Sequence, residues 1–105
     1  MRFLVRATVS LEAGNAQLRR PGFGEKLMRT LASLNAEATY FAVENGARVI
    51  YLIVTVLGSD EIPRIAEPLW VVCEATVDFI PLITLEDMEK AGPHIEALAR
   101  SEMEQ

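Results

Sequence analysis

The sequence predicts an α+β protein with a ferredoxin-like, split βαβ fold, in which a four-stranded antiparallel sheet has the order β-α-β-β-α-β and a C-terminal helix follows. The dipeptide Asn45-Gly46 lies between two runs of strand-forming residues, 39–44 and 48–57, and supplies the two positive φ angles of a type I′ hairpin turn. Amphipathic helical patterns flank this hairpin, and a strand-like segment lies beyond each of them. We therefore expect a single ferredoxin-like domain over residues 1–105.

The hairpin turn also predicts which residues share a face of the sheet. If Glu44 faces Ala47 across the turn, then Tyr40 faces Tyr51 and alternate side chains fall on opposite faces. One face is expected to be apolar and to lie against the helices: Phe3, Val5, Ala7, Phe41, Val43, Ile50, Leu52, Val54, Val77 and Phe79. The other, which we call the mixed face, is expected to hold Leu4, Arg6, Thr8, Tyr40, Glu44, Tyr51, Ile53, Thr55, Asp78 and Ile80.

The elements before the hairpin follow from periodicity. Alternation over residues 3–9 predicts the first strand, and Ser10 can cap a short helical segment that ends near residue 18. From Phe23 onward, apolar residues recur at helical spacing as far as Leu34, which predicts an amphipathic helix on the sheet.

After the hairpin, Ser59 or Asp60 opens a second amphipathic helix, and residues 77–82 form the fourth strand. Pro81 places the end of that strand at a sheet edge, because proline cannot donate to a ladder. Thr84 and Asp87 have the spacing of a capping box. They predict a third helix that is interrupted at Gly92-Pro93 and resumes to about residue 102.

Composition narrows the function classes. Half of the 105 residues are hydrophobic, which suits a packed core, and the formal net charge of −5 argues against nucleic-acid binding. One cysteine permits no intrachain disulfide. The first residues do not form a signal peptide, and the longest apolar run, 49–57, is about half of what spans a bilayer. We expect a cytoplasmic protein without a membrane segment.

The mixed face carries the one predicted cluster in which a cation, two carboxylates and two phenols lie together. Arg6, Tyr40 and Tyr51 can position a small acidic or aromatic ligand, and Glu44 or Asp78 can act as a general base if burial raises its pKa. Alternatively, these groups pair with one another at a subunit interface. Because so many apolar side chains share this face, we expect a homodimer that buries it.

Three further features are candidates. His94 follows Gly92-Pro93 and is expected in a helix first turn, where the helix dipole favours a neutral imidazole that can accept a proton; alternatively it is a surface residue. The basic, glycine-bearing loop 19–24 is either an anion site or a solvated loop. Cys73 falls on an apolar helical stripe and is expected to be a buried structural thiol. A single histidine excludes a multi-histidine metal site within one chain, and no cofactor is expected.

Several segments carry a resemblance to a known group of proteins: residues 3–8, 13–15, 40–41, 45–46, 62–69 and 79–81. Through them the chain resembles the dimeric α+β barrel superfamily, which includes muconolactone isomerase-like proteins and cofactor-free monooxygenases. It is most similar to an uncharacterised family of small bacterial proteins. The resemblance implies two sheets packed face to face in a dimer, with small ligands bound between sheet and helices. The histidine pattern of the monooxygenase branch is not evident, since His94 lies in the C-terminal helix.

Two functions are compatible with these features. The first is a small cytoplasmic homodimer that binds a small molecule or a protein partner at the sheet face. The alternative is a cofactor-free enzyme, of isomerase or monooxygenase type, that acts on a small aromatic or carbonyl acid with Arg6 holding the anion.

Overall fold

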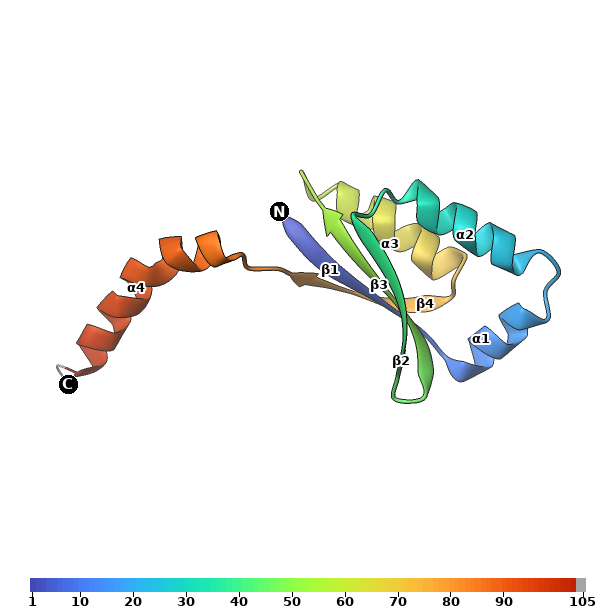
Figure 1. Cartoon of the computed structure of the whole chain (residues 1–105), viewed down its shortest axis with the longest axis horizontal. Coiled ribbons are helices and arrows are strands. Elements are labelled where there is room, and N and C mark those ends of the chain that lie inside the picture. The colour runs from blue at the N-terminus through green and yellow to red at the C-terminus, as the bar shows by residue number, and fades with distance from the viewer. Residues whose placement is uncertain (104–105) are drawn as a thin grey trace.

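A computed structural model describes residues 1–103. Four strands and four helices follow one another in the order β-α-α-β-β-α-β-α (Figure 1). Their bounds are β1 Arg2–Val9, α1 Leu11–Leu18, α2 Phe23–Ser33, β2 Ala38–Glu44, β3 Ala47–Thr55, α3 Glu61–Val71, β4 Ala75–Pro81 and α4 Leu85–Met103. The α+β, ferredoxin-like fold predicted from the sequence is confirmed.

The four strands form one antiparallel sheet in the order β2-β3-β1-β4. This order is that of the split βαβ arrangement, because each crossover helix carries the chain past a neighbouring strand. β4 is an edge strand, so Pro81 ends it where no ladder partner is lost. Its N-terminal end begins two residues earlier than predicted, at Ala75.

The β2–β3 hairpin has the predicted register. Asn45 and Gly46 have φ angles of 51° and 74°, and Tyr40 pairs with Tyr51. Positive φ at both central residues is what a two-residue turn needs to match the twist of the strands. The turn therefore fixes the register between β2 and β3. The other edge of β3 pairs with β1.

Two helices, α2 and α3, cover the apolar face, while α1 lies beside the end of the sheet (Figure 1). Ser10 caps α1 by accepting a hydrogen bond from the backbone N–H of Ala13 at 3.1 Å, as predicted. Residues of β1, β3, α2 and α3, together with Cys73 in the turn after α3, form most of the hydrophobic core, and among its most completely buried members are Val5, Ala7, Leu52, Ile65, Leu69 and Cys73.

Two residues predicted to belong to this core are exposed. Phe41 and Val43 lie on the helix side of β2, but 58% and 78% of their surfaces are accessible. The reason is the placement of β2 at the sheet edge, where the tip of the hairpin projects beyond α2 (Figure 1). The helix buries Leu31 and Leu34 near its C-terminal end and leaves the face above the tip uncovered.

The C-terminal helix α4 extends away from the sheet as an arm, which gives the described chain a longest dimension of 65 Å (Figure 1). None of its residues is buried. The predicted capping box is present: the Thr84 N–H donates to Asp87 Oδ2, and the Asp87 N–H donates to Thr84 Oγ1, both at 3.0 Å.

Two predictions about this helix were wrong. The helix runs through Gly92 and Pro93 without interruption, because a proline inside a long helix removes a single backbone hydrogen bond and does not always end it. Consequently His94 lies in the middle of α4 rather than in a first turn, and the helix dipole gives it no special environment. Within residues 1–103, no helix combines the length and the apolar character needed to cross a membrane.

Candidate functional site

The predicted polar cluster lies on the mixed face, in the register expected. Arg6 of β1 faces Tyr51 of β3 on one side and Asp78 of β4 on the other. Its Nη2 donates to Glu44 Oε2 at 2.7 Å, its Nε donates to Tyr51 Oη at 3.4 Å, and its Nη1 lies 4.0 Å from Asp78 Oδ2. The strands thus bring together the residues that the sequence assigned to one site.

The same contacts occupy the guanidinium. Glu44 neutralises Arg6 at close range, so an acidic ligand would have to displace a carboxylate that is already hydrogen bonded. Asp78 is two-thirds exposed and approaches Arg6 from the outer strand. This arrangement favours the alternative in which the charges pair with one another, and ligand binding by Arg6, Tyr40 and Tyr51 stays a prediction.

The remaining sequence candidates do not converge with this cluster. His94 lies on the α4 arm, far from the sheet face (Figure 1). In the basic loop, Arg20 Nη2 donates to Glu74 Oε2 at 3.0 Å, so one of its two arginines is already paired. No group of three histidine, cysteine, aspartate or glutamate side chains in residues 1–103 is placed to hold a metal ion.

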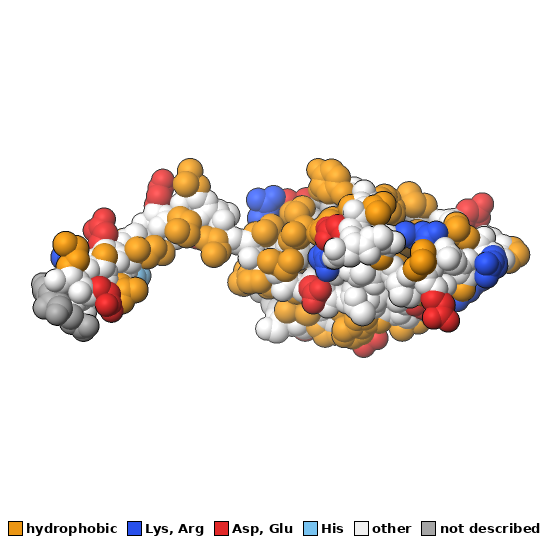
Figure 2. All heavy atoms as spheres, turned by 90° about the horizontal axis from the view of Figure 1, so that it is seen from below, with side chains coloured by type: hydrophobic (Ala, Val, Ile, Leu, Met, Phe, Trp, Pro, Cys, Tyr) orange, Lys and Arg blue, Asp and Glu red, His pale blue; other side chains and the backbone are white. Residues whose placement is uncertain are grey.

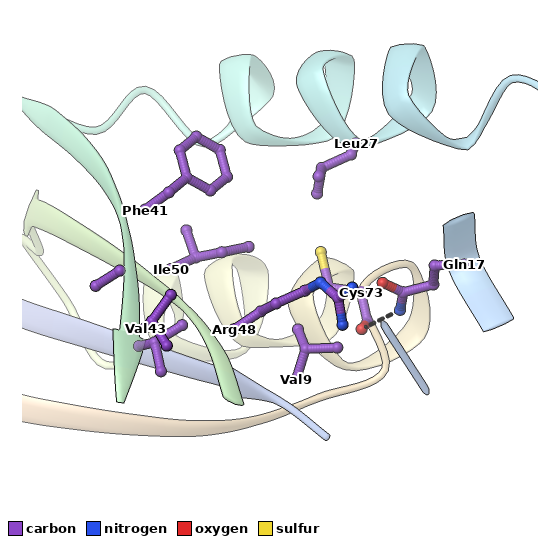
Figure 3. Close-up of a pocket in the computed structure, with 10 residues that line it drawn as sticks. Val9, Gln17, Leu27, Phe41, Val43, Arg48, Ile50 and Cys73 are labelled. Atoms are coloured by element: carbon purple, nitrogen blue, oxygen red, sulfur yellow. Dashed lines mark hydrogen bonds between the residues drawn. The ribbon is translucent and has the colours of Figure 1, made fainter. Parts of the chain in front are cut away.

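A second candidate site lies on the opposite side of the sheet, where α2 leaves the hairpin tip uncovered. It is a pocket of about 410 Å³, large enough for a small organic molecule. Figure 3 shows Leu27 reaching down from α2 toward the pocket, Phe41 and Ile50 on its sheet side, and Val9 at its far end. The exposed apolar surface of Phe41 and Val43 is therefore one wall of a cavity.

Two polar side chains enter this apolar cavity, Gln17 from α1 and Arg48 from β3 (Figure 3). Both Nη1 and Nη2 of Arg48 donate to a single acceptor, Asn15 Oδ1, at 3.3 Å. Among residues 1–103, Arg48 forms no ion pair, in contrast to Arg6, Arg20 and Arg64. Its charge is thus available to an anion.

The Arg48 side chain occupies the space that a side chain at position 14 would fill, so its position depends on Gly14. A Cβ atom built on Gly14 would lie 2.4 Å from Arg48 Nη1 and 3.1 Å from both Cδ and Cζ. Any other residue at this position would force the flexible end of Arg48 to move, so the observed position of the guanidinium depends on Gly14. The backbone of α1 therefore serves as the surface against which Arg48 packs.

Gln17 fixes the floor of the pocket. Its side chain is buried, and Nε2 donates to the Cys73 carbonyl at 2.6 Å and to Glu74 Oε2 at 3.2 Å. These bonds hold the end of α3, where Glu74 has a φ of 54°, a left-handed conformation that few residues adopt. Hydrogen bonds from Gln17 and Arg20 lower the pKa of the Glu74 carboxyl below its usual range.

Cys73 contributes its thiol to the pocket wall and is buried, as the sequence predicted, but it lies in the turn after α3 and not on the helical stripe that the sequence predicted. Desolvation raises the pKa of this thiol, so it stays protonated and unreactive at neutral pH. Its role is that of an apolar wall residue.

Reasoning from the residue pattern missed this pocket, although one signal was present; only the resemblance implied a ligand between the sheet and the helices. The hairpin register places Arg48 opposite Val43, on the same face as Ile50 and Leu52, where a charged side chain is out of pattern. A lone cation on the apolar face marks the end of the core. The hairpin register does not predict the approach of α1 to the sheet, which brings Gly14 and Gln17 close to Arg48.

The chain was compared with models of protein families, with curated proteins and with solved structures, and none of the three comparisons gave a match. The resemblance to the dimeric α+β barrel superfamily therefore stays a prediction.

Proposed function

We propose that this protein binds a small organic acid with an aromatic or branched apolar body in the pocket between α2 and the hairpin. The observation that carries the proposal is Arg48, a guanidinium that has no carboxylate partner within residues 1–103 and lies at a cavity whose only other polar lining side chain in that range is Gln17. Apolar walls with one or two well-placed polar groups are the usual composition of small-molecule sites.

The chemistry of the walls suggests the ligand class. The exposed ring of Phe41 offers an aromatic surface for stacking, and Leu27 and Ile50 supply aliphatic contacts. A carboxylate at Arg48 would gain charge-assisted hydrogen bonds without displacing an ion pair. The carboxylate of Glu74, which accepts a hydrogen bond from the pocket residue Gln17, is also paired with Arg20, and this pairing reduces its repulsion of an incoming anion.

The proposal also includes a homodimer that buries the mixed face, together with a cytoplasmic location. Figure 2 views the molecule from the side opposite α2 and α3, and hydrophobic side chains gather there around a few charged groups. Tyr40 and Ile80 are 61% and 41% exposed on this face. Apolar side chains that gather on an exposed face and are surrounded by charged groups often mark a protein–protein interface.

The enzymatic alternative lacks a base at the pocket. The low pKa of Glu74 makes it a weak proton acceptor, and the thiol of Cys73 stays protonated. Binding without turnover is therefore the function that the pocket supports best, and an isomerase or monooxygenase activity stays a prediction.

A matched pair of ligands tests the proposal. We expect 2-naphthoate to bind the protein in isothermal titration and neutral 2-naphthamide to bind much more weakly, because the amide loses the charge-assisted hydrogen bond. In Arg48→Leu the two ligands should bind alike, with the acid weakened about 10- to 100-fold, which corresponds to roughly 1.5–3 kcal/mol for a hydrogen bond to a charged group. Arg6→Leu serves as the control and should leave both affinities unchanged. If Arg6→Leu removes binding and Arg48→Leu does not, the ligand site lies on the mixed face.

A further inference from the structure

We infer that α4 is an exchange arm, which leaves its own subunit and packs on the mixed face of a second copy of the same chain. The inference rests on the proposed homodimer and adds the segment that holds it together. Four observations carry it: the direction of the arm, its apolar stripe, the distribution of its charges and the matching dimensions of the two surfaces.

The direction of α4 is set locally by the residues between β4 and the helix. The Leu82 N–H donates to the Arg2 carbonyl at 2.9 Å, which extends the ladder one residue beyond β4. Thr84 and Asp87 close the capping box immediately afterwards. Ile83 is thus the one residue between two fixed points, and folding α4 back onto its own sheet would require one of them to open.

The arm has a narrow apolar stripe that no part of residues 1–103 covers. Met88, Ala91, Ile95 and Leu98 recur at intervals of three, four and three residues, the spacing of one helix face. Met88, Ile95 and Leu98 are about half or more exposed. Gly92 lies next to the stripe and lets a partner backbone approach closely.

This helix needs a partner for its stability. Pro93 leaves the carbonyl of Glu89 without a helical N–H partner and introduces the least favourable residue into the middle of the helix. In proteins, most of the stability of a helix comes from packing of its apolar face rather than from helix propensity. Packing of the stripe on a second surface supplies the stabilising free energy that the isolated helix lacks.

The charges of the arm point to an apolar protein surface rather than a lipid bilayer. Glu86, Glu89, Lys90, Glu96 and Arg100 all lie off the stripe. Residues 85–103 contain five acidic and two basic residues, whereas helices that lie on membranes usually carry lysine and arginine on their polar face. An acidic helix is likewise repelled by nucleic acid.

The mixed face of a second copy has the required chemistry and size. The stripe from Met88 to Leu98 is about 15 Å long at 1.5 Å per residue. Four strands spaced about 4.8 Å apart span about 14 Å, so the helix can cross the whole sheet. Leu4, Ile53 and Ile80 lie side by side in the register of that face and provide the apolar floor.

Two-fold symmetry completes the arrangement. If the arm of one subunit lies on its partner, the partner's arm lies on the first subunit, and the same contact is made twice in a closed dimer. Each subunit then covers with its helix the surface that the other leaves exposed, which accounts for both unpartnered surfaces of the chain.

A charge-insertion pair of variants tests this arm exchange by light scattering. Ile95→Glu with Leu98→Glu places two charges on the stripe, and Ala97→Glu with Met103→Glu places two charges on the same helix but off the stripe. We expect the wild type to be a dimer, the stripe variant to dissociate at least tenfold more readily, and the control variant to match the wild type. Because both variants add two glutamates to α4 and have the same net charge, the added charge alone cannot produce the difference.

A mixed sample of ¹³C-labelled and unlabelled subunits provides a second readout. Filtered nuclear Overhauser effects between subunits are expected from the methyl groups of Ile95 and Leu98 to those of Leu4, Ile53 and Ile80. A stripe variant that remains fully dimeric while Ile53→Lys dissociates would overturn the arm exchange but preserve the dimer of the proposed function. A monomeric wild type would overturn both. Binding of α4 to neutral phosphatidylcholine vesicles, with no contacts between subunits, would assign the stripe to a membrane instead.

Discussion

At the scale of single residues, Gly14 and Arg48 act as one unit. The guanidinium of Arg48 packs against the α1 backbone at Gly14, and any side chain there meets it at 2.4 Å. We expect Gly14→Ala to displace Arg48 and to weaken binding of 2-naphthoate about tenfold, while binding of 2-naphthamide changes little. Gly24→Ala is the matched control, because a Cβ atom at Gly24 meets nothing within 4 Å. Equal effects of the two substitutions on affinity would show that Arg48 does not hold the acid.

Gly46 is important for a different reason, its backbone conformation. Gly46 has a φ of 74°, and a Cβ atom built on it would meet nothing within 4 Å. A substitution there therefore acts through backbone strain alone. Gly46→Val is expected to lower the free energy of unfolding by about 1–3 kcal/mol, because a β-branched residue rarely adopts this region. Gly46→Asn, which tolerates positive φ, should be much milder. Urea unfolding curves that coincide for the wild type and the valine variant would rule out the strained turn.

At the scale of elements, the start of α4 depends on pH through its capping box. The backbone N–H of Thr84, together with its hydroxyl, lowers the pKa of Asp87 below the ordinary value of 3.8. A lowered pKa in the folded state means that the stabilising contribution is complete above the ordinary value and is lost as pH falls through the lowered one. We expect the amide signals of Thr84 and Asp87 to shift together in this acidic range, and Asp87→Asn to remove the transition. Signals of the first turn of α4 that do not change between pH 5 and pH 2 would contradict the capping role.

The elements also show how far the sequence determines this structure. Asn45-Gly46 and the alternation around it predicted the hairpin, its register and both faces of the sheet, because turn geometry and strand pleating are local properties. The uncovered end of the apolar face was not predicted, since it depends on how far α2 reaches across the edge strand. The continuous course of α4 through Pro93 was also missed, because a single proline has no fixed outcome in a long helix.

At the scale of the whole molecule, the exposed mixed face is the surface on which we propose that a second subunit packs. We expect Ile53→Lys, in the middle of that face, to dissociate the dimer or to lower its solubility, because it would bury an unpaired charge. Ser33→Lys on the outer surface of α2 is the control and should have no effect on the mass measured by light scattering. A dimer that persists in Ile53→Lys would place the interface elsewhere.

The two candidate sites differ in whether the sequence alone could predict them, because one depends on local structure and the other on tertiary packing. The cluster of Arg6, Glu44 and Asp78 was predicted because strand register alone brings it together, and the structure shows its charges paired. The pocket with Arg48 depends on the packing of α1 and α2 on the sheet, which periodicity does not specify. The free cation therefore became visible only in the folded chain.

The face of the sheet on which an acid binds distinguishes the Arg48 pocket from the mixed face. A nuclear magnetic resonance titration of the ¹⁵N-labelled protein with 2-naphthoate reports it residue by residue. We expect the largest shifts at Gln17, Leu27, Phe41, Arg48 and Cys73, the residues around the pocket. Shifts concentrated at Arg6, Tyr40, Tyr51 and Asp78 would instead place the ligand on the mixed face and contradict the assignment of Arg48 as its anchor.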